Sequence, residues 1–376
     1  MQNPVPANRI GKMKPYQPPS VGSEVLVRLD ANEGPVCEQS TLNVLASITP
    51  DQVNRYPDAS PLEQMIAQIH DVDPRCVVVT NGADDAIDRV VRAVVEQGTN
   101  AVLHTPTFEM INRSVKLCGG KLISTPWIDW DFPLTSMLDS INKDTKLVSV
   151  VTPNNPTGRS VSPGDIRAIA QRAGDVGAVV MVDQAYGEFD QIDPYETLKE
   201  SKNIVFLRTF SKSMGLAGIR VGYAIAPVEI ADWMRTVGGP YPVSSISLAI
   251  AASALELVST RANLIDTVKR NRQVLINQLI TLGAKPIESN ANFVLVQFDD
   301  ALSMHTSLLK MGISVRKYNP GSVLKDYLRI TVPADADQFK LLSTSIDSIL
   351  PNVPKNTREQ PKAPAESTQT SSGALS

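Results

Sequence analysis

Residues 203–220 read Asn203-Ile204-Val205-Phe206-Leu207-Arg208-Thr209-Phe210-Ser211-Lys212-Ser213-Met214-Gly215-Leu216-Ala217-Gly218-Ile219-Arg220. The stretch opens with an apolar run that is typical of a buried strand. A serine, a lysine, a glycine-containing turn and an arginine follow directly. This set suits a reactive amine with an anion held beside it by hydroxyl and guanidinium groups. A Ser-Lys pair by itself is more often part of a solvated surface loop, so its meaning depends on the rest of the chain.

The bulk composition indicates a globular protein. With 376 residues the chain can bury a large core, and its length favours two domains. Charged residues make up 20% and apolar residues 42%, and a net charge of −3 gives no reason to expect nucleic acid or an anionic membrane as partner. The apolar runs are far shorter than the roughly 18 residues of a membrane span. Residues 1–14 lack the apolar core of a signal peptide.

Cysteine and histidine usage predicts neither disulfides nor a metal site. The cysteines are too few and too scattered for a disulfide framework, with no CxxC motif, at Cys37, Cys76 and Cys118. The histidines show no metal-ligand spacing and are interpreted as structural or surface residues, at His70, His104 and His305. We therefore expect a cytoplasmic metabolic enzyme that binds no metal.

Short apolar runs alternate with amphipathic stretches from about residue 75 onward. Strands are expected at residues 77–80, 101–103, 121–123, 146–151, 178–182, 204–207 and 221–225, with helices at 84–95 and 108–117. The strands are continuously apolar rather than alternating, which indicates a sheet covered on both faces. The pattern predicts an α/β protein with a mostly parallel seven-stranded sheet.

The pattern changes after Pro240 and predicts a smaller α+β domain. Helices are expected at residues 247–257, 261–282, 301–311 and 335–350, and strands at 292–296, 313–315 and 327–332. We divide the chain into an N-terminal arm that completes the small domain (1–45), a large domain (46–245), the small domain (246–350) and a tail (351–376). The tail is rich in Pro, Ser, Thr, Gln and Lys without aromatic residues, so we expect it to be disordered.

Polar motifs follow the predicted strands where the ligand of an open α/β sheet binds. Asn81-Gly82-Ala83-Asp84 offers small residues and a helix N-terminus to an anion, although a plain turn capped by Asp84 fits equally well. Phe108 supplies a flat ring for stacking, or else a core aromatic. The turn around Asn155, between two prolines, holds an amide donor or simply reverses the chain.

Asp183 closes the apolar run of residues 178–182, with Tyr186 three residues on. A carboxylate at a buried strand end needs a partner or its pKa rises, and a protonated ring nitrogen would be such a partner. A helix-capping aspartate is the alternative. Together with Lys212, Ser211 and Arg220, these motifs provide a Schiff-base amine, an anion clamp, a pyridinium partner, a phenolate donor and a stacking ring. Pyridoxal 5′-phosphate (PLP) requires that set.

With these motifs the chain resembles the fold-type I PLP-dependent aminotransferases, and within them the histidinol-phosphate aminotransferase branch. The resemblance covers about residues 8–350. It also rests on Leu29-Asp30-Ala31-Asn32-Glu33-Gly34-Pro35, Arg55-Tyr56-Pro57-Asp58, Asn154-Asn155-Pro156-Thr157-Gly158, Val182-Asp183-Gln184-Ala185-Tyr186 and Leu328-Arg329-Ile330-Thr331-Val332. The sequence Lys14-Pro15-Tyr16 matches this branch in particular, or else is an ordinary aromatic anchor of the arm.

The resemblance implies a role for each cofactor-binding residue. Lys212 would form the Schiff base with the cofactor and move the α-proton, and Asp183 would pair with the pyridine nitrogen. Asn155 and Tyr186 would bind the phenolic oxygen of the cofactor, and Phe108 would stack on its ring. Its phosphate would be held by Ala83, Asp84, Ser211 and Arg220. Tyr56 would reach the phosphate in the neighbouring subunit, so the resemblance implies a homodimer with shared sites.

The resemblance also implies the substrate contacts. Arg329 would bind the α-carboxylate of glutamate. In the other half-reaction Tyr16, Arg316 and Arg329 would receive the phosphate of histidinol phosphate. Asn32 and, from the partner chain, Tyr241 complete the expected substrate site.

Some positions depart from the pattern of the branch. Phe108 stands where tyrosine is usual and loses the phenol, and Gln184 replaces a glutamate and removes one negative charge. Asp85 is one methylene shorter than the frequent glutamate, and Pro333 stands where glycine is commoner.

We therefore expect transamination between glutamate and imidazole-acetol phosphate in histidine biosynthesis. An aromatic or broad-specificity amino acid aminotransferase, or a threonine-phosphate decarboxylase, would share most of these motifs. A PLP-binding regulator usually carries a basic helix-turn-helix domain, and nothing of that kind precedes residue 20.

Overall fold

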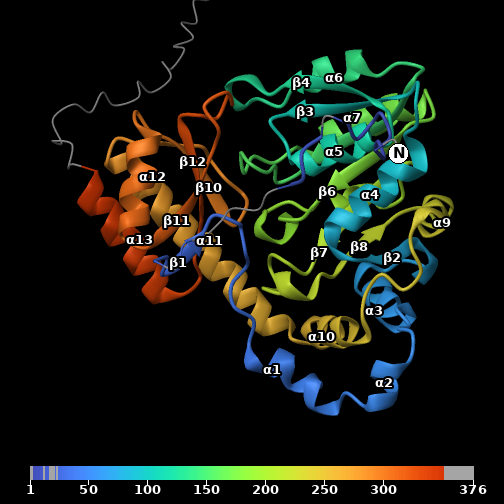
Figure 1. Ribbon diagram of the computed structural model, residues 1–376, viewed down its shortest axis with the longest axis horizontal. Helices are drawn as coiled ribbons and strands as arrows, with labels where there is room; N and C mark the ends of the chain where they lie inside the picture. Colours follow the sequence, from blue (N-terminus) through green and yellow to red (C-terminus); the bar gives the residue numbers. More distant parts are fainter. Residues whose placement is uncertain (1–2, 12, 17–21, 23, 351–376) are drawn as a thin grey trace, which may run out of the picture.

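A computed structural model describes residues 3–11, 13–16, 22 and 24–350 of the chain. The described residues form two sheets that lie side by side, each with its own helices (Figure 1). The predicted disordered tail, 351–376, lies outside the described residues.

The larger sheet has seven strands in the order β2-β8-β7-β6-β5-β3-β4. Its strands are β2 (Val77–Thr80), β3 (Asn100–Thr105), β4 (Lys121–Pro126), β5 (Thr145–Val151), β6 (Val179–Asp183), β7 (Ile204–Thr209) and β8 (Gly222–Ile225). The pairs from β7 through β4 are parallel, and β8 is antiparallel to both β7 and β2. The predicted α/β fold with a mostly parallel seven-stranded sheet is confirmed.

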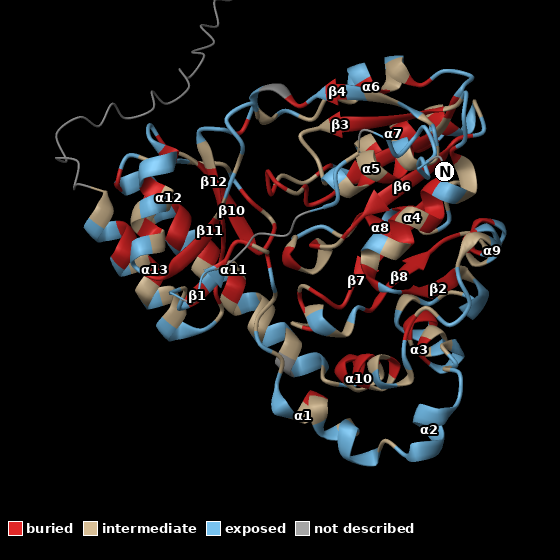
Figure 2. Ribbon diagram, in the orientation of Figure 1, coloured by how far each residue is buried: buried red, intermediate tan, exposed pale blue. Residues whose placement is uncertain are grey.

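Helices cover both faces of this sheet, which explains why its strands are apolar throughout. One face packs against α4 (Gly82–Val94), α5 (Glu109–Leu117) and α9 (Val228–Val237). The other face packs against α3 (Ser60–His70), α6 (Leu134–Ser140), α7 (Pro163–Gly174), α8 (Pro194–Leu198) and α10 (Ser245–Glu256). Figure 2 shows the buried residues concentrated in the strands and on the inner sides of these helices.

Local sequence explains where the helices begin, and α7 is a clear example. The Ser162 hydroxyl accepts a hydrogen bond from the amide of Asp165 at 3.0 Å, and Pro163 occupies the first helical turn, where no amide donor is needed. Ile166 and Ile169 then lie on one face of the helix and are fully buried against the sheet.

The smaller sheet has the strand order β1-β11-β12-β10-β9. Its strands are β1 (Val27–Leu29), β9 (Lys285–Pro286), β10 (Phe293–Gln297), β11 (Ile313–Lys317) and β12 (Tyr327–Thr331). A separate core forms between these strands and α11 (Val258–Thr281), α12 (Ala301–Lys310) and α13 (Ala336–Ile349). Because β1 pairs in parallel with β11, the residues that follow β1 are placed beside the ends of both sheets.

The observed elements differ from the expected ones at their ends, and several helices and short strands were not predicted at all. Helix α4 begins at Gly82 rather than residue 84, and Phe108 is the N-cap of α5 rather than its first residue. The unpredicted helices are α1 (Gln39–Leu42), α2 (Pro50–Asn54), α3, α6, α7, α8 and α9, and the unpredicted strands are β1 and β9. In the described part of the chain no single helix is long and apolar enough to span a membrane, whereas α10 and residues 261–281 together meet that test as a pair bent by 78°.

Candidate active site

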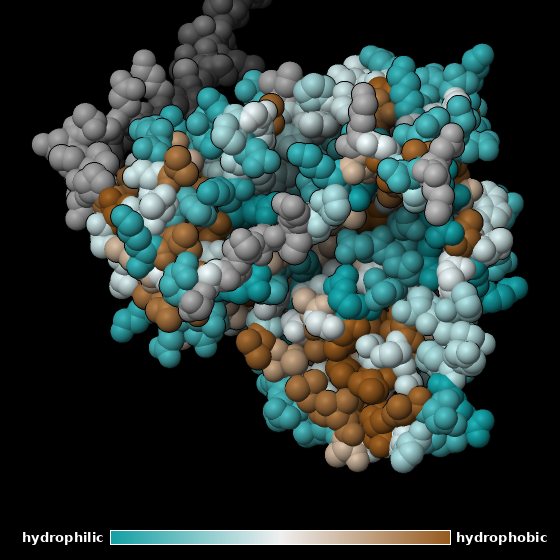
Figure 3. Space-filling view, viewed as in Figure 1, coloured by the Kyte–Doolittle hydropathy of each residue, from teal (hydrophilic) through white to brown (hydrophobic). Residues whose placement is uncertain are grey.

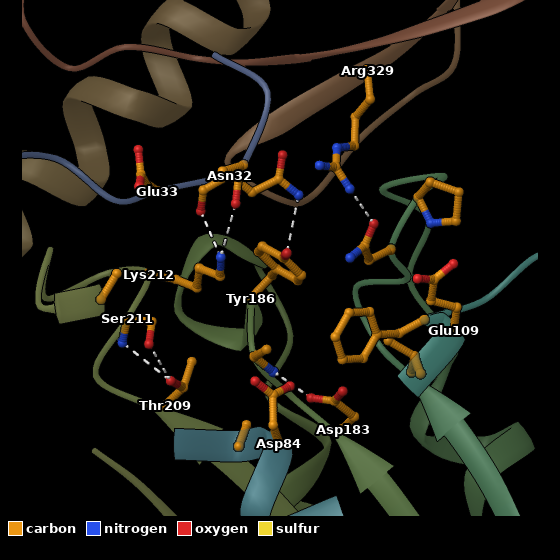
Figure 4. Close-up of a pocket in the computed structure, with 18 of the residues that line it drawn as sticks. Asn32, Glu33, Asp84, Glu109, Asp183, Tyr186, Thr209, Ser211, Lys212 and Arg329 are labelled. Carbon is orange, nitrogen blue, oxygen red and sulfur yellow. Dashed lines mark hydrogen bonds between the residues drawn. The ribbon is translucent and has the colours of Figure 1, made fainter. Parts of the chain in front are cut away.

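A cavity of about 370 Å³ lies at the carboxyl ends of the strands of the larger sheet. This is the edge where parallel α/β sheets bind their ligands. The cavity brings together most of the predicted site residues, and Figure 4 shows many of them pointing into it. Its lining includes Tyr16, Asn32, Ala83, Asp84, Phe108, Asn155, Asp183, Tyr186, Ser211, Lys212, Arg220, Arg316 and Arg329.

Lys212 lies in the segment that follows β7, and its amine contacts the backbone of the segment that follows β1. The Nζ atom donates a hydrogen bond to the carbonyl oxygen of Asn32 at 2.8 Å and lies 3.4 Å from that of Ala31 (Figure 4). Burial, followed by the nearby positive charge of Arg329, lowers the pKa of Lys212 to about 8. A substantial fraction of the amine is therefore unprotonated near neutral pH, as a nucleophile or base requires.

Close backbone packing holds the Lys212 segment in place. A Cβ atom on Gly34 would lie 1.7 Å from the carbonyl oxygen of Lys212. Gly215 has a φ of +66°, and its Cβ would lie 1.8 Å from the carbonyl oxygen of Pro35. Only glycine allows the two backbones to approach this closely.

Asp183 is the last residue of β6, and few protein groups compensate its buried carboxylate for the loss of hydration. One oxygen, Oδ1, accepts a hydrogen bond from the amide of Ala185 at 3.0 Å. Burial raises the pKa of Asp183 to about 6, with a small opposing contribution from that hydrogen bond. A cationic group in the cavity would restore the ionised form, and a protonated ring nitrogen fits this need.

Tyr186 and Asn32 form a buried pair beside Lys212. The side-chain amide of Asn32 donates to the Tyr186 hydroxyl at 3.0 Å, and Lys212 Nζ lies 5.5 Å from the centre of the Tyr186 ring (Figure 4). Burial raises the pKa of Tyr186, so the phenol remains protonated and can donate a hydrogen bond to an oxygen in the cavity.

One end of the cavity is built to hold an anion. Arg220 Nη1 lies 3.4 Å from the Ser211 hydroxyl and Nη2 lies 3.2 Å from Asp84 Oδ2. Gly82, with a φ of +76°, starts α4 here, and a Cβ atom on it would lie 2.5 Å from Arg220 Nη2. A helix N-terminus, a hydroxyl and a guanidinium together suit a phosphate group.

Arg329 on β12 marks the opposite end of the cavity. Its Nη1 donates to Asn155 Oδ1 at 2.6 Å and its Nη2 donates to the carbonyl oxygen of Asp30 at 2.8 Å. Its Nε is buried without a partner among the described residues. Arg316 lies directly opposite Arg329 in the sheet and also lines the cavity, so this end can hold a second anion. Tyr16 is a further residue of the lining.

Tyr56 and Tyr241 are the predicted site residues that this cavity does not include. Their rings stack on each other with centroids 4.6 Å apart, and the side chains are 80% and 55% exposed. Both were expected to serve the site of a partner chain, and that remains a prediction.

Gln184, one of the departures noted in the sequence, belongs to a buried polar network beneath the site. The Arg208 Nη2 atom lies 3.3 Å from Gln184 Oε1 and forms an ion pair with Asp193, and Gln184 Nε2 donates to Asp193 Oδ1 at 2.8 Å. Burial acts to raise the pKa of Asp193, but the ion pair with Arg208 and these hydrogen bonds lower it overall. Arg208 therefore has carboxylate partners without a charge at position 184, because Asp193 pairs with its Nη2 and Glu188 Oε1 lies 3.9 Å from its Nη1.

Sequence reasoning missed several residues of the cavity lining. They are Glu33, Thr209, Glu109 and Tyr318. The sequence contained a signal for Tyr318, because alternate residues of a strand face the same side and Tyr318 lies two positions after Arg316.

The chain matches known proteins along most of its length. The family aminotransferase class I and II matches residues 26–342. Histidinol-phosphate aminotransferase 1 of Dechloromonas aromatica (strain RCB) is 31% identical over 344 residues, which are 88% of this chain and 94% of the relative. Histidinol-phosphate aminotransferase of Thermoanaerobacter pseudethanolicus (strain ATCC 33223 / 39E) is 35% identical over 314 residues, 81% of this chain and 88% of the relative.

A solved structure shares the fold. It is histidinol-phosphate aminotransferase from Sinorhizobium meliloti in complex with pyridoxal-5′-phosphate, with a TM-score of 0.79 and 25% sequence identity. The match covers 87% of this chain and 91% of that chain.

Proposed function

The chain belongs to the class I and II aminotransferases, and from this premise we propose that it transfers an amino group between glutamate and imidazole-acetol phosphate, forming histidinol phosphate and 2-oxoglutarate. The observation that carries the proposal is a cavity with a reactive lysine between two anion-binding ends. The relatives named histidinol-phosphate aminotransferase support the choice of substrate.

The cofactor is PLP, and the residues present fit it. Arg220, Ser211 and the start of α4 would hold its phosphate, and Asp183 would pair with its ring nitrogen. Asn155 and Tyr186 would bind its phenolic oxygen, and Phe108 would stack on the ring. When bound, PLP supplies an electron sink for the charge that remains when the Cα–H bond of the donor breaks.

Lys212 performs the proton transfer in this scheme. Its lowered pKa makes the free amine available near neutral pH, where Nζ removes the proton from Cα of the amino donor. In the second half-reaction the same amine returns a proton to Cα of the acceptor. The Asn32 and Ala31 carbonyls hold Nζ above the cavity between these events.

The two substrates use the Arg329 end of the cavity in turn. The Arg329 guanidinium would bind the α-carboxylate of glutamate, and Arg316 and Tyr16 would join it in binding the phosphate of histidinol phosphate. A planar guanidinium accommodates both because it presents paired donors to carboxylate and phosphate alike. Asn32 shapes the wall next to Lys212.

We also propose that the enzyme is a homodimer that acts in the cytoplasm on small-molecule substrates. Figure 3 shows apolar surface gathered over α10 and α1, where exposed apolar side chains include Val36, Leu45, Ile246 and Val258. A second copy on this face would cover the patch and bring Tyr56 and Tyr241 to the neighbouring site. In the cytoplasm the free thiols of the three cysteines would stay reduced.

The test is the visible absorbance of the PLP-loaded protein after mixing with one substrate at a time. We expect histidinol phosphate alone to bleach the absorbance of the bound cofactor within one turnover, and 2-oxoglutarate to restore it. Lys212→Ala should show no turnover, and normal rates in that variant without an added amine would contradict the assignment.

Phenylalanine and phosphothreonine serve as comparators. A fast response to phenylalanine without one to histidinol phosphate would make the chain an amino acid aminotransferase. Carbon dioxide released from phosphothreonine would make it a threonine-phosphate decarboxylase.

A further inference from the structure

Tyr318 lies at the Arg329 end of the cavity and so far has no role. It follows β11, two residues after Arg316, and lines the cavity together with Arg316, Arg329 and Tyr16. Its hydroxyl is fully buried yet has no hydrogen-bond partner among the described residues. A buried hydroxyl without a partner costs free energy, so this site is suited to a ligand that supplies one.

The surroundings of Tyr318 make its hydroxyl a donor to an anion. Burial raises the pKa of the phenol, while the nearby guanidinium groups of Arg329 and Arg316 lower it less strongly. The phenol is therefore protonated near neutral pH and faces a region of positive charge. An anion bound there would meet one more donor than the two arginines supply.

We propose that the Tyr318 hydroxyl donates a hydrogen bond to the phosphate of the phosphorylated substrate and so favours that substrate over glutamate. The inference rests on the proposed function, because it assigns a residue to the same substrate site. A carboxylate has two oxygens, and the Arg329 fork can bind both. A phosphate has a third terminal oxygen, which the Tyr318 hydroxyl binds alongside Arg316.

The experiment compares the PLP-loaded wild type with Tyr318→Phe, which removes only the hydroxyl and keeps the ring. Tyr327→Phe is the matched control, because this tyrosine lies in the same sheet but outside the cavity lining. Single-turnover absorbance changes give the rate and the apparent Kd for histidinol phosphate and for glutamate separately. Inhibition of the glutamate half-reaction by inorganic phosphate gives a third readout that needs no phosphorylated substrate.

We expect Tyr318→Phe to weaken apparent binding of histidinol phosphate by about 10- to 100-fold, the usual range for a hydrogen bond to a charged group. Glutamate binding should change less than about threefold, phosphate inhibition should weaken, and Tyr327→Phe should behave as wild type. A merely structural role for Tyr318 would impair both substrates and lower the thermal unfolding midpoint.

The two proposals fail in different ways. Equal losses for histidinol phosphate and glutamate, or no loss for either, would overturn the role of Tyr318. If the wild type ignores histidinol phosphate, the proposed function fails. Weaker phosphate inhibition in Tyr318→Phe would then still support a phosphate contact at Tyr318.

Discussion

Burial shifts the pKa values of the two titratable groups at the centre of the site in opposite directions. Lys212 has a lowered pKa and Asp183 a raised one, because burial disfavours the charged form of each. The charge state of each group therefore depends on what occupies the cavity.

The Asp183 carboxylate should destabilise the protein when the cofactor is absent. The folded-state pKa of about 6 lies above the ordinary aspartate value of 3.8, so the unfolded chain binds fewer protons between these values and stability falls as the pH rises through them. Asp183→Asn should raise the stability of the cofactor-free protein at pH 7 by on the order of a few kcal/mol. The gain should vanish below about pH 4 and turnover should be lost, as urea unfolding and activity assays would show. An equal gain at both pH values would contradict the assigned cause.

Lys212 should control how fast the cofactor-free protein takes up PLP. Only the unprotonated amine can attack the aldehyde, and the folded-state pKa is about 8 instead of 10.5. The second-order rate of PLP uptake should therefore rise as the pH increases from 6 and level off above about pH 8. A rate that keeps rising to pH 10 would show that the amine is not desolvated as described. Lys212→Ala, which lacks the amine, provides the baseline.

At the scale of elements, the site depends on segments that touch backbone to backbone. Gly34→Ala should push the segment after β1 away from the segment after β7, because the new Cβ would meet the Lys212 carbonyl oxygen at 1.7 Å. We expect a loss of about 1–3 kcal/mol in stability and a larger proportional loss in activity. Gly321→Ala is the control, since a Cβ there meets nothing within 4 Å. Unfolding midpoints and kcat of both variants provide the measurement, and a neutral Gly34→Ala would refute the close approach.

The loop between β6 and α8 carries Asp193, whose carboxylate pairs with the buried Arg208 guanidinium. Asp193→Asn should leave the buried Arg208 guanidinium with Glu188, 3.9 Å away, as its remaining carboxylate. The expected loss of stability is about 1–3 kcal/mol, a figure discounted because the Asp193 side chain is 34% exposed. Adding Gln184→Glu should recover at least half of that loss, because position 184 already contacts Arg208. Urea unfolding of both single variants and the double variant measures the coupling. Additive losses would show that the two positions do not share a charge role.

At the scale of the whole molecule, the proposed dimer should share its active sites. Tyr56→Ala is expected to lower activity about 10-fold by removing a hydrogen bond to the phosphate of the neighbouring cofactor. Hybrid dimers of Tyr56→Ala and Lys212→Ala should then regain activity, since one of the two sites draws its lysine and its tyrosine from unmodified positions. If Tyr56 served its own chain, no hybrid would contain an intact site and activity would not return. Differently tagged chains purified in two steps provide the hybrid.

The sequence alone predicted the larger sheet and most of the residues that the structure gathers around one cavity. Continuous apolar runs reveal strands covered on both faces, and the strand end at Asp183 and the segment at Lys212 each combine an apolar run with a polar group of unusual type. These signals are local, because each is contained in a few neighbouring residues of the chain. Helices α1 and α2 span only four and five residues, too few for a helical period to show. Helix α3 buries Leu62 and Ile66 at helical spacing, so the sequence carried its signal and the prediction missed it.

Only the tertiary structure decided which distant residues meet. The carbonyl of Asn32 reaches the amine of Lys212, and Asn155 reaches Arg329, across separations of 180 and 174 residues. The place of Tyr318 in the cavity likewise depends on how the two sheets lie against each other. The physical reason is that secondary-structure propensity and hydrophobic periodicity are properties of a few neighbouring residues. Shifted pKa values and unpartnered hydroxyls instead arise from the packing of segments that are far apart in the chain.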